Sequence, residues 1–414
     1  MSVRQAGTGR HSPRFLIGMM CLAQLLTMLS ISVYAAQLAR LRDLWSLTNT
    51  EAGWIGAAYF VGYTIAVPVL TSLTDRMDPR RIYFAGCVLL AVGCAGFGAM
   101  SQGFGSAALF HALAGAGLAG TYMPGLKGLL DQLDEQYHSR ASAFYTASFG
   151  LGAALSYPFS AYVAEAIGWS WSFYGAGFAG LLAALLVGAV LPGADHAKLN
   201  LASTRLLDFR PILRNRAVLA YTIGYTVHCW ELFGMRTWVV AYLLYAQGLH
   251  GTAPGWAAPA LVAALLTVIG VPVSIYGNEL AMWLGRRRFV IGVMCASALV
   301  CFVIGPVAQV SYWLAALICI LHGATVIFDS ASLTAGALGN AEPGYRGATM
   351  AVHSTLGFAG ATFGPLVFGL ALDAGGGQTP MGWWLGYAHM GMVLLAGAAV
   401  LWLLRAPPVT GDLR

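Results

Sequence analysis

Apolar segments long enough to cross a lipid bilayer recur along the whole chain. A helix needs about 20 apolar residues to span the hydrocarbon core, and the sequence offers twelve such runs between short polar stretches. The predicted helices cover residues 15–38, 52–73, 82–100, 107–130, 141–167, 171–191, 217–245, 257–276, 289–304, 312–338, 348–372 and 384–404. This pattern predicts an all-α integral membrane protein.

The first apolar run follows three arginines and resembles a signal peptide in outline. It covers residues 15–38, which is longer than the roughly 7–15 apolar residues of a signal-peptide core. We therefore expect this run to be retained as the first transmembrane helix.

The longest polar stretch, residues 192–216, divides the predicted helices into two sets of six. We therefore predict an N-terminal six-helix bundle over residues 1–191, a cytoplasmic linker over 192–216 and a C-terminal six-helix bundle over 217–414. The chain outside the apolar runs is too short to suggest a further domain.

Short similarities between the two halves suggest a diverged internal repeat. Arg140 precedes a run of small residues as Arg346 does in the second half, and Pro158 aligns with Pro365 when one residue is inserted. Parallel repeats of six helices are one way in which transporter halves are built. The repeat therefore predicts two pseudo-symmetric bundles.

Composition supports a lipid-facing surface. The chain is 58% hydrophobic and 9% charged, with a mean hydropathy of +0.70, whereas soluble domains carry roughly 25% charged residues. The net charge of +6 does not indicate nucleic acid, because the basic residues are scattered over short loops and form no patch with aromatic residues. We expect the lipid bilayer, and no nucleic acid, as a partner.

The seven cysteines lie inside apolar stretches, and none forms a CxxC pair. This spacing favours neither a metal site nor a disulfide framework. The chain also lacks the Walker A, H-E-x-x-H and G-x-S-x-G patterns that mark ATP-driven and hydrolytic chemistry. We therefore expect no cofactor, no metal and no enzymatic activity.

Basic residues predict the orientation of the chain. With the N-terminus in the cytoplasm, 19 of the 22 lysines and arginines fall in cytoplasmic segments, whereas Arg40 and Arg42 fall outside and Arg236 lies within a helix. Loops rich in Lys and Arg stay on the cytoplasmic side. We therefore predict a multi-pass protein of a bacterial inner membrane with both termini in the cytoplasm.

The loop after the second predicted helix resembles a motif of the major facilitator superfamily. In that family an acid-base pair and clustered basic residues join helices 2 and 3. The matching residues are Asp75, Arg76, Arg80 and Arg81. Two family glycines are replaced, by Thr71 and Asp78. An acid at a helix end accepts hydrogen bonds from arginines and from a neighbouring helix N-terminus.

The resemblance implies the two-bundle fold of that superfamily and a cytoplasmic gate. We expect the gate to contain Asp75, Arg76, Arg80, Arg81, Arg140 and Arg346. The alternative is that these charges only anchor loops in the cytoplasm. The second half repeats the basic part of the motif at 285–288, but Met282 stands at the position of the acid. A gate contact in the second half would therefore lack the acid that the first half has.

Small residues and prolines in two helices predict close packing and bending. Residues Gly360, Gly364 and Pro365 lie in the run 348–372, where small residues allow helices to approach and proline bends the helix. Pro158 lies in the fifth helix, but no glycine directly precedes it as in the antiport motif of the superfamily. We assign these four residues to helix packing and hinges.

Ionisable residues inside a spanning helix are costly and usually mark a pathway. The run 217–245 carries His228, Glu231 and Arg236. His228 and Glu231, three residues apart, share a helix face. Arg236 is five residues beyond Glu231, about 140° around the helix, so we do not expect a Glu231–Arg236 ion pair. Glu231 is a proton carrier, a substrate counter-charge or a brace between helices.

Four further polar residues join this predicted substrate and proton pathway. His322 and Asp329 are seven residues apart on one face of the run 312–338, and His353 lies in 348–372. Asp329 either belongs to the pathway or ties 312–338 to 348–372. His111 stands where the superfamily often carries an arginine linked to proton transfer, and it is either a titrating group or a neutral hydrogen-bonded one.

These observations predict a secondary active transporter that moves a small solute by alternating access, coupled to protons and acting as a monomer. Arg236 and the histidines favour an anionic solute, whereas Glu231 and Asp329 suit a cation or a proton. Two alternatives are a transporter-like membrane receptor or sensor and a membrane-embedded enzyme. A receptor would bind its ligand without passing it through proteoliposomes.

Overall fold

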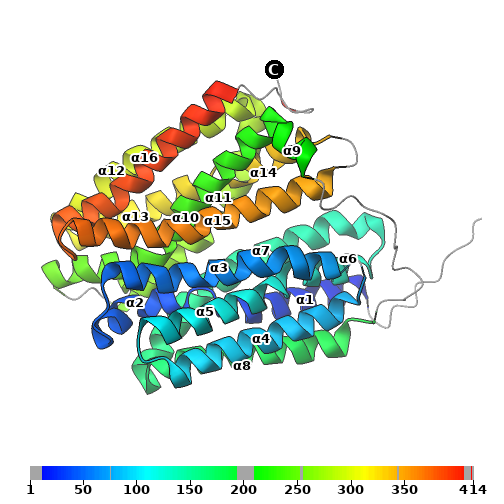
Figure 1. The fold of residues 1–414 in the computed structure, drawn as a ribbon, viewed down its shortest axis with the longest axis horizontal. Helices are drawn as coiled ribbons and strands as arrows, with labels where there is room; N and C mark the ends of the chain where they lie inside the picture. The colour runs from blue at the N-terminus through cyan, green and yellow to red at the C-terminus, as the bar shows by residue number, and fades with distance from the viewer. Residues whose placement is uncertain are drawn as a thin grey trace, which may run out of the picture.

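The structure is a computed structural model that describes residues 12–74, 76–193, 209–251, 255–342, 345–404 and 412. Within these ranges every regular element is a helix, and Figure 1 shows long helices running side by side along the molecule. The prediction of an all-α protein is confirmed.

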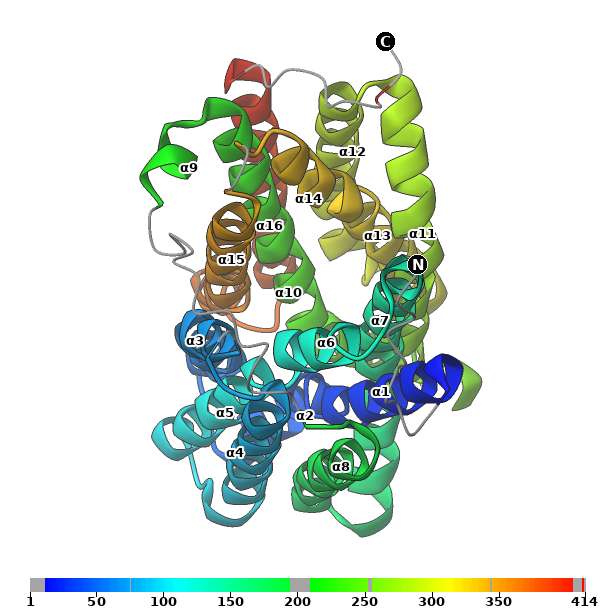
Figure 2. The ribbon, with the colours of Figure 1, turned by 90° about the vertical axis from the view of Figure 1, so that its right-hand side faces the viewer.

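The N-terminal half, residues 12–193, forms one bundle of helices (Figures 1 and 2). Its elements are α1 (Pro13–Met28), α2 (Val33–Leu44), α3 (Asn49–Leu73), α4 (Pro79–Met100), α5 (Phe104–Ala119), α6 (Tyr122–Leu130), α7 (Glu135–Ile167) and α8 (Trp169–Val190). Several helices begin at a side-chain cap. Asp78, for example, accepts a hydrogen bond from the backbone N–H of Arg80 at the start of α4.

The C-terminal half, residues 209–404, forms a second bundle (Figures 1 and 2). Its elements are α9 (Arg210–Arg214), α10 (Arg216–His250), the 3₁₀ turn η2 (Gly255–Ala257), α11 (Pro259–Leu284), α12 (Arg286–Val307), α13 (Tyr312–Ile327), α14 (Ser330–Gly339), α15 (Arg346–Ala374) and α16 (Pro380–Leu404). The halves meet where α3 packs beside α15, α7 beside α11, and α2 beside α10 (Figure 2).

Three helices predicted as continuous are broken, which corrects the sequence analysis. Residues 15–38 form α1 and the start of α2, residues 107–130 form α5 and α6, and residues 312–338 form α13 and α14. Polar or flexible residues lie at each break: Ser30, Gly120 and Asp329. Mean hydropathy averages over a window, so it does not register a single tight turn.

Nine of the described helices or joined helix pairs are long and apolar enough to cross a membrane. The segments α5–α6, α7 and α10 are not among them, and α10 carries Glu231 and Arg236 near its middle. The count of twelve spanning helices therefore stays a prediction, while a multi-pass membrane protein is supported.

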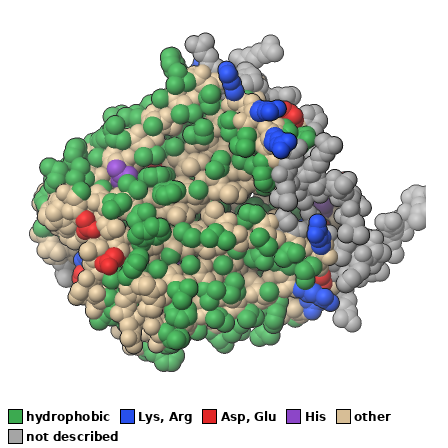
Figure 3. Space-filling model, viewed as in Figure 1, with side chains coloured by type: hydrophobic (Ala, Val, Ile, Leu, Met, Phe, Trp, Pro, Cys, Tyr) green, Lys and Arg blue, Asp and Glu red, His purple; other side chains and the backbone are tan. Residues whose placement is uncertain are grey.

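Charged side chains gather at the ends of the molecule. Apolar side chains cover much of the face shown in Figure 3, whereas Lys and Arg cluster toward the end where α6 and α9 lie. We call this the basic end. The opposite end, where α3 begins and α15 finishes, is called the Asp373 end after the acid in the last turn of α15.

Glycines allow α3 and α5 to touch backbone to backbone. A Cβ atom added to Gly62 would lie 1.8 Å from the carbonyl oxygen of Ala112, and one added to Gly115 would lie 1.8 Å from that of Tyr59. Both distances are far inside van der Waals contact, so neither position accepts a side chain without separating the helices. These two contacts set the distance between α3 and α5.

The glycines predicted for helix packing make the equivalent contact in the C-terminal half. A Cβ added to Gly360 or Gly364 on α15 would lie 2.1 Å from a backbone oxygen of α10. Pro365 lies inside α15, and its carbonyl oxygen accepts a hydrogen bond of 3.0 Å from the indole of Trp238 on α10. Pro158 lies inside α7. The hinge role of both prolines stays a prediction.

Candidate functional site

Helix α10 presents ionisable side chains on two different faces. Glu231 points toward α12 and α13, where its carboxylate meets His322, whereas Arg236 lines a cavity between the halves. In the described part of the chain these two residues form no ion pair with each other. Their five-residue spacing thus places the two side chains on different faces of α10.

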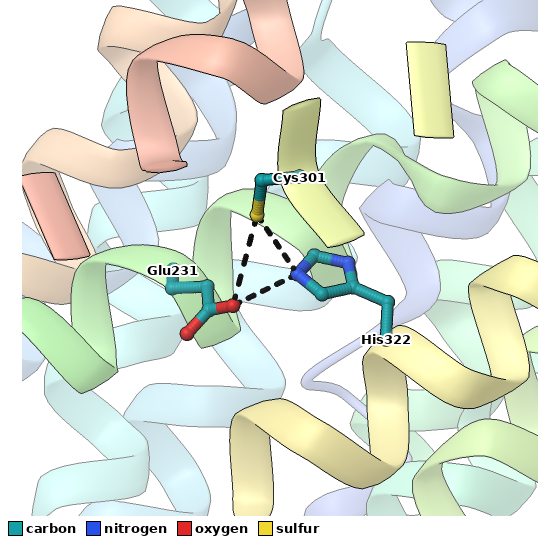
Figure 4. Close-up of side chains that lie close together, drawn as sticks. All are labelled: Glu231, Cys301 and His322. Carbon is teal, nitrogen blue, oxygen red and sulfur yellow. Dashed lines mark hydrogen bonds and ion pairs between the residues drawn. The ribbon is translucent and has the colours of Figure 1, made fainter. Parts of the chain in front are cut away.

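A buried polar cluster surrounds Glu231 (Figure 4). His322 Nε2 lies 2.8 Å from Glu231 Oε1, and the Ser297 hydroxyl donates to the same oxygen at 2.5 Å. The Cys301 sulfur lies 3.3 Å from His322 Nε2 and 3.8 Å from Glu231 Oε1. All four residues are at most 2% exposed. Helices α10, α12 and α13 thus enclose one carboxyl-imidazole pair in an apolar surrounding.

This cluster contains three side chains of metal-ligand type. The donor atoms of Glu231, Cys301 and His322 all lie within 4.8 Å of one another. Ligands of a tetrahedral zinc ion, held at roughly 2.0–2.3 Å, stand about 3.3–3.8 Å apart. The 2.8 Å between Glu231 and His322 is instead a hydrogen-bond distance, so this geometry fits a shared proton better than a metal.

A second carboxyl-imidazole pair lies nearby. His228 Nδ1 and Asp329 Oδ1 are 2.9 Å apart, which is the distance of an ion pair, yet neither atom is aligned for a hydrogen bond. The Tyr225 ring stacks between His228 and His353, at 5.6 and 4.1 Å. Asp329 thus lies against α10, and both roles predicted for it, in the pathway and in joining 312–338 to 348–372, stay predictions.

A cavity lies between the halves, on the opposite face of α10. Residues from α2, α3, α5 and α7 of one half and α10 of the other line it. Its larger lining side chains are Tyr34, Tyr59, Phe60, His111, Tyr157, Phe233, Arg236 and Thr237. The space between the lining atoms, including the open side of the cavity, is about 380 Å³. The centre of a water molecule fits into only about 20 Å³ of it. The cavity is therefore narrow in this conformation.

Arg236 is the cationic side chain in this cavity. Its guanidinium carbon lies 5.9 Å from the centre of the Phe233 ring, and its Nε is buried with no hydrogen-bond partner. No carboxylate of the described residues lies within ion-pair distance of it. Tyr157 of α7 donates to the backbone carbonyl of Arg236 at 2.7 Å, which joins the two halves beside the guanidinium.

His111 is held on the other side of the cavity. Its Nδ1 lies 2.7 Å from the carbonyl oxygen of Ile55, and a carbonyl can only accept, so Nδ1 carries the proton. The rings of Tyr34 and Tyr59 lie 5.1 and 4.9 Å from the imidazole. Its Nε2 is buried without a partner. Two roles were predicted for His111, a titrating group or a neutral hydrogen-bonded one, and the bond to Ile55 favours the hydrogen-bonded role.

The predicted gate residues lie at the basic end. Asp75 is outside the described residues. Arg80 donates to the carbonyl oxygen of Leu191 at 3.2 Å. The other gate arginines, Arg76, Arg81, Arg140 and Arg346, are exposed. None of these arginines forms an ion pair with another described residue, so their gating role stays a prediction.

The opposite end carries a polar contact between the halves that sequence reasoning missed. Asp373 Oδ1 accepts from the backbone N–H and the side-chain amide of Asn49, at 3.1 and 2.7 Å. Its Oδ2 accepts from the N–H and the hydroxyl of Thr50, at 2.8 and 2.6 Å. Gln378 also donates to Asn49 across the halves, at 3.1 Å. The acid of α15 thus caps the first turn of α3.

Comparisons with known proteins agree on one family. A family model described as Major Facilitator Superfamily matches residues 20–365. A probable sphingolipid transporter spinster homolog 1 of Arabidopsis thaliana is 28% identical over 134 residues, 31% of this chain and 26% of that protein. A sphingosine-1-phosphate transporter of Xenopus tropicalis is 22% identical over 341 residues, 78% of this chain and 66% of that protein. The chain therefore spans less than two thirds of these curated relatives.

Solved structures share the fold. A bacterial homolog of the human lysosomal transporter Spinster, in an inward-facing and occupied conformation, superimposes with a TM-score of 0.73 at 14% identity, over 96% of both chains. The nucleoside transporter NupG gives a TM-score of 0.73 at 13% identity, over 95% of this chain and 100% of that one. At such identities the likeness concerns the fold alone.

Proposed function

The chain belongs to the Major Facilitator Superfamily, and from this premise we propose that it is a secondary active transporter of a small solute, driven by protons. The observation that carries this proposal is the cavity lined by both halves beside Arg236. A site at the interface of two bundles becomes accessible from either side when one bundle rocks against the other.

Contacts at the Asp373 end support such a motion. Asp373 holds the first turn of α3 through hydrogen bonds from Asn49 and Thr50, and these partners belong to different halves. Asp373 and its bonds to Thr50 are exposed, whereas its bonds to Asn49 are partly buried, so water can replace them when the halves separate. This end is therefore a reversible closure, as alternating access requires.

The orientation follows from the distribution of positive charge. Arg76, Arg81, Arg140 and Arg346 are exposed at the basic end, and the positive-inside rule assigns such an end to the cytoplasm. On this assignment the closed Asp373 end faces away from the cytoplasm. We place the protein in a bacterial inner membrane with both termini in the cytoplasm.

Proton coupling is supported by the two buried carboxyl-imidazole pairs, Glu231 with His322 and His228 with Asp329. Each pair holds two groups that bind and release protons, away from water and within one half. Ionisable groups buried at such depth in transporters often serve as proton relays. Uptake or release of one proton changes the charge of a pair and with it the packing of α10 against α13.

The test is transport by purified protein in liposomes. A thermal-shift screen of metabolites identifies a stabilising solute, and its flux is then measured with and without a pH gradient, with a protonophore as control. We expect the gradient to drive accumulation of the solute and the protonophore to abolish it. Accumulation that persists after collapse of both pH and sodium gradients would contradict ion coupling, and binding without any flux would favour a receptor.

A further inference from the structure

We propose that the transported solute is a small organic anion with an apolar ring-sized body, whose acid group binds Arg236. This inference rests on the proposed transport function and adds the class of the substrate. It is carried by one partly buried cation, whose Nε is buried without a partner and which has no described carboxylate within ion-pair distance, in a cavity whose other walls are mainly aromatic.

The guanidinium of Arg236 is the starting point. It stays protonated in proteins, and it lies in a helix at the centre of a membrane protein with its Nε buried and unpartnered. Its described surroundings offer the Phe233 ring, at 5.9 Å, and no carboxylate within ion-pair distance. A buried charge without a partner is strongly destabilising. A bound anion supplies the missing partner.

The nearby acids are already engaged elsewhere. Glu231 faces away from Arg236 around α10, and its Oε1 is shared with His322 and Ser297. Asp329 lies against His228, 2.9 Å away. No aspartate or glutamate lines the cavity itself. The cavity therefore carries a positive charge of its own, which attracts an anion and repels a cation.

The other walls determine the body of the solute. Phe60 of the N-terminal half and Phe233 of the C-terminal half lie with their ring centres 4.3 Å apart, and Tyr34 and Tyr59 complete an aromatic wall. Such walls favour a flat apolar body, because ring faces pack against it. A strongly hydroxylated solute would leave its hydroxyl groups unpaired against these rings.

Polar groups beside Arg236 are few and suit one acid group. Thr237 and Ser32 line the cavity near it, and His111 presents a buried Nε2 without a partner. A planar guanidinium binds a carboxylate or a phosphate through two parallel hydrogen bonds. A single arginine matches one such group. A solute with a single acid group is therefore the best complement, and the free volume shows that the aromatic walls must part to admit it.

The experiment compares four ligands with the same ring. Phenylacetate and phenyl phosphate carry the acid, whereas phenylacetamide is neutral and phenethylamine is a cation. Binding to the purified full-length protein is measured by thermal shift and calorimetry. We expect the two anions to bind and the amide and the amine to bind at least tenfold more weakly. Preference between carboxylate and phosphate then identifies the acid group.

Variants assign the effect to the proposed residue. Arg236→Gln should weaken binding of the preferred anion about 30-fold or more. Arg236→Lys should weaken it less, because lysine keeps the positive charge but lacks the planar guanidinium that makes two parallel hydrogen bonds. Arg236→Gln should not lower the melting temperature of the ligand-free protein, because the partly buried guanidinium forms no ion pair with a described residue. Arg216→Gln, at an exposed arginine in the first turn of the same helix α10, is the matched control and should change neither property.

The outcomes separate this inference from the proposed function. Equal binding by wild type and Arg236→Gln, or tighter binding of the amide or the amine, overturns the inference. Gradient-driven transport of a neutral or cationic solute also overturns it, although the proposed function stands. Anion binding that depends on Arg236 without any flux upholds the anion site and contradicts the transport function.

Discussion

Replacing Asp373 tests whether its contact with α3 holds the Asp373 end closed. The carboxylate accepts four hydrogen bonds from Asn49 and Thr50 of the other half, at 2.6–3.1 Å. It also lies at the positive end of the α3 helix dipole. Asp373→Asn keeps the shape and leaves one oxygen as an acceptor. Its amide NH₂ then faces the N–H of Thr50, and two donors cannot bond.

The expected magnitude follows from these contacts. A net intramolecular hydrogen bond contributes about 0.5–1.5 kcal/mol, and the exposed position of Asp373 favours the lower value. Four bonds then stabilise the closed form by about 2 kcal/mol, and the asparagine variant keeps about half of them. Loss of the other half, together with the carboxylate charge at the α3 helix dipole, costs about 1.4 kcal/mol, which shifts the ratio of closed to open forms about tenfold. A population of 99% closed would fall to about 90%.

The assay measures the distance between the halves at this end. Spin labels at the exposed positions Gln102 and Met381, introduced as cysteines, report it in reconstituted protein. The partly accessible Cys21 and Cys295 are first replaced by serine. We expect Asp373→Asn to add a longer-distance population of roughly a tenth of the molecules.

The control removes an acid from the first turn of α3, the turn that Asp373 caps, without removing a contact between the halves. Glu51 accepts from the N–H and hydroxyl of Thr48, at 2.9 and 3.0 Å, within one half. Glu51→Gln should therefore leave the distances unchanged. Identical distance distributions in wild type and Asp373→Asn would refute the reasoning, and so would equal opening in the two variants.

Two further variants examine the Glu231–His322 pair and the backbone contact between α3 and α5 at Gly62. Glu231→Gln keeps hydrogen bonding to His322 but cannot release a proton. We expect solute binding and exchange to persist while gradient-driven accumulation falls at least tenfold. Weakened binding would instead make Glu231 a counter-charge, and a lower Tm with normal pH dependence would make it a brace. Gly62→Ala should lower stability by about 1–3 kcal/mol in thermal denaturation, because the added methyl meets a carbonyl oxygen 1.8 Å away. Gly188→Ala, where nothing lies within 4 Å, is the control, and an equal loss there would contradict the packing argument.

The sequence predicted the architecture well because lipid imposes it. Runs of apolar residues must be helical in a bilayer, since every backbone group has to be bonded internally. The breaks at Ser30, Gly120 and Asp329 could not be predicted this way, because each depends on local turns and on tertiary contacts. The break at Asp329 in turn places its carboxylate against His228, a contact that no spacing along the chain specifies.

Side-chain partners were harder to predict than the positions of the ionisable residues. The membrane-embedded acids and histidines stood out because charges are rare there. Ser297 and Cys301 carry no such signal, yet both contact the Glu231–His322 pair. Asp373 lies at a helix end, where acids are common. Its role required knowing that α3 begins beside it in the other half.

The five-residue spacing between Glu231 and Arg236 has a mechanistic consequence. It places the Glu231–His322 pair and the cavity cation on different faces of one helix. Under the proposed function, a proton and an anion then need not compete for one group, and coupling between them would pass through movement of α10. The backbone of that helix is bound at Arg236 by Tyr157 of the other half. Under the same proposal, a change in how α10 packs against α13 would reach the contact between the two halves through this bond.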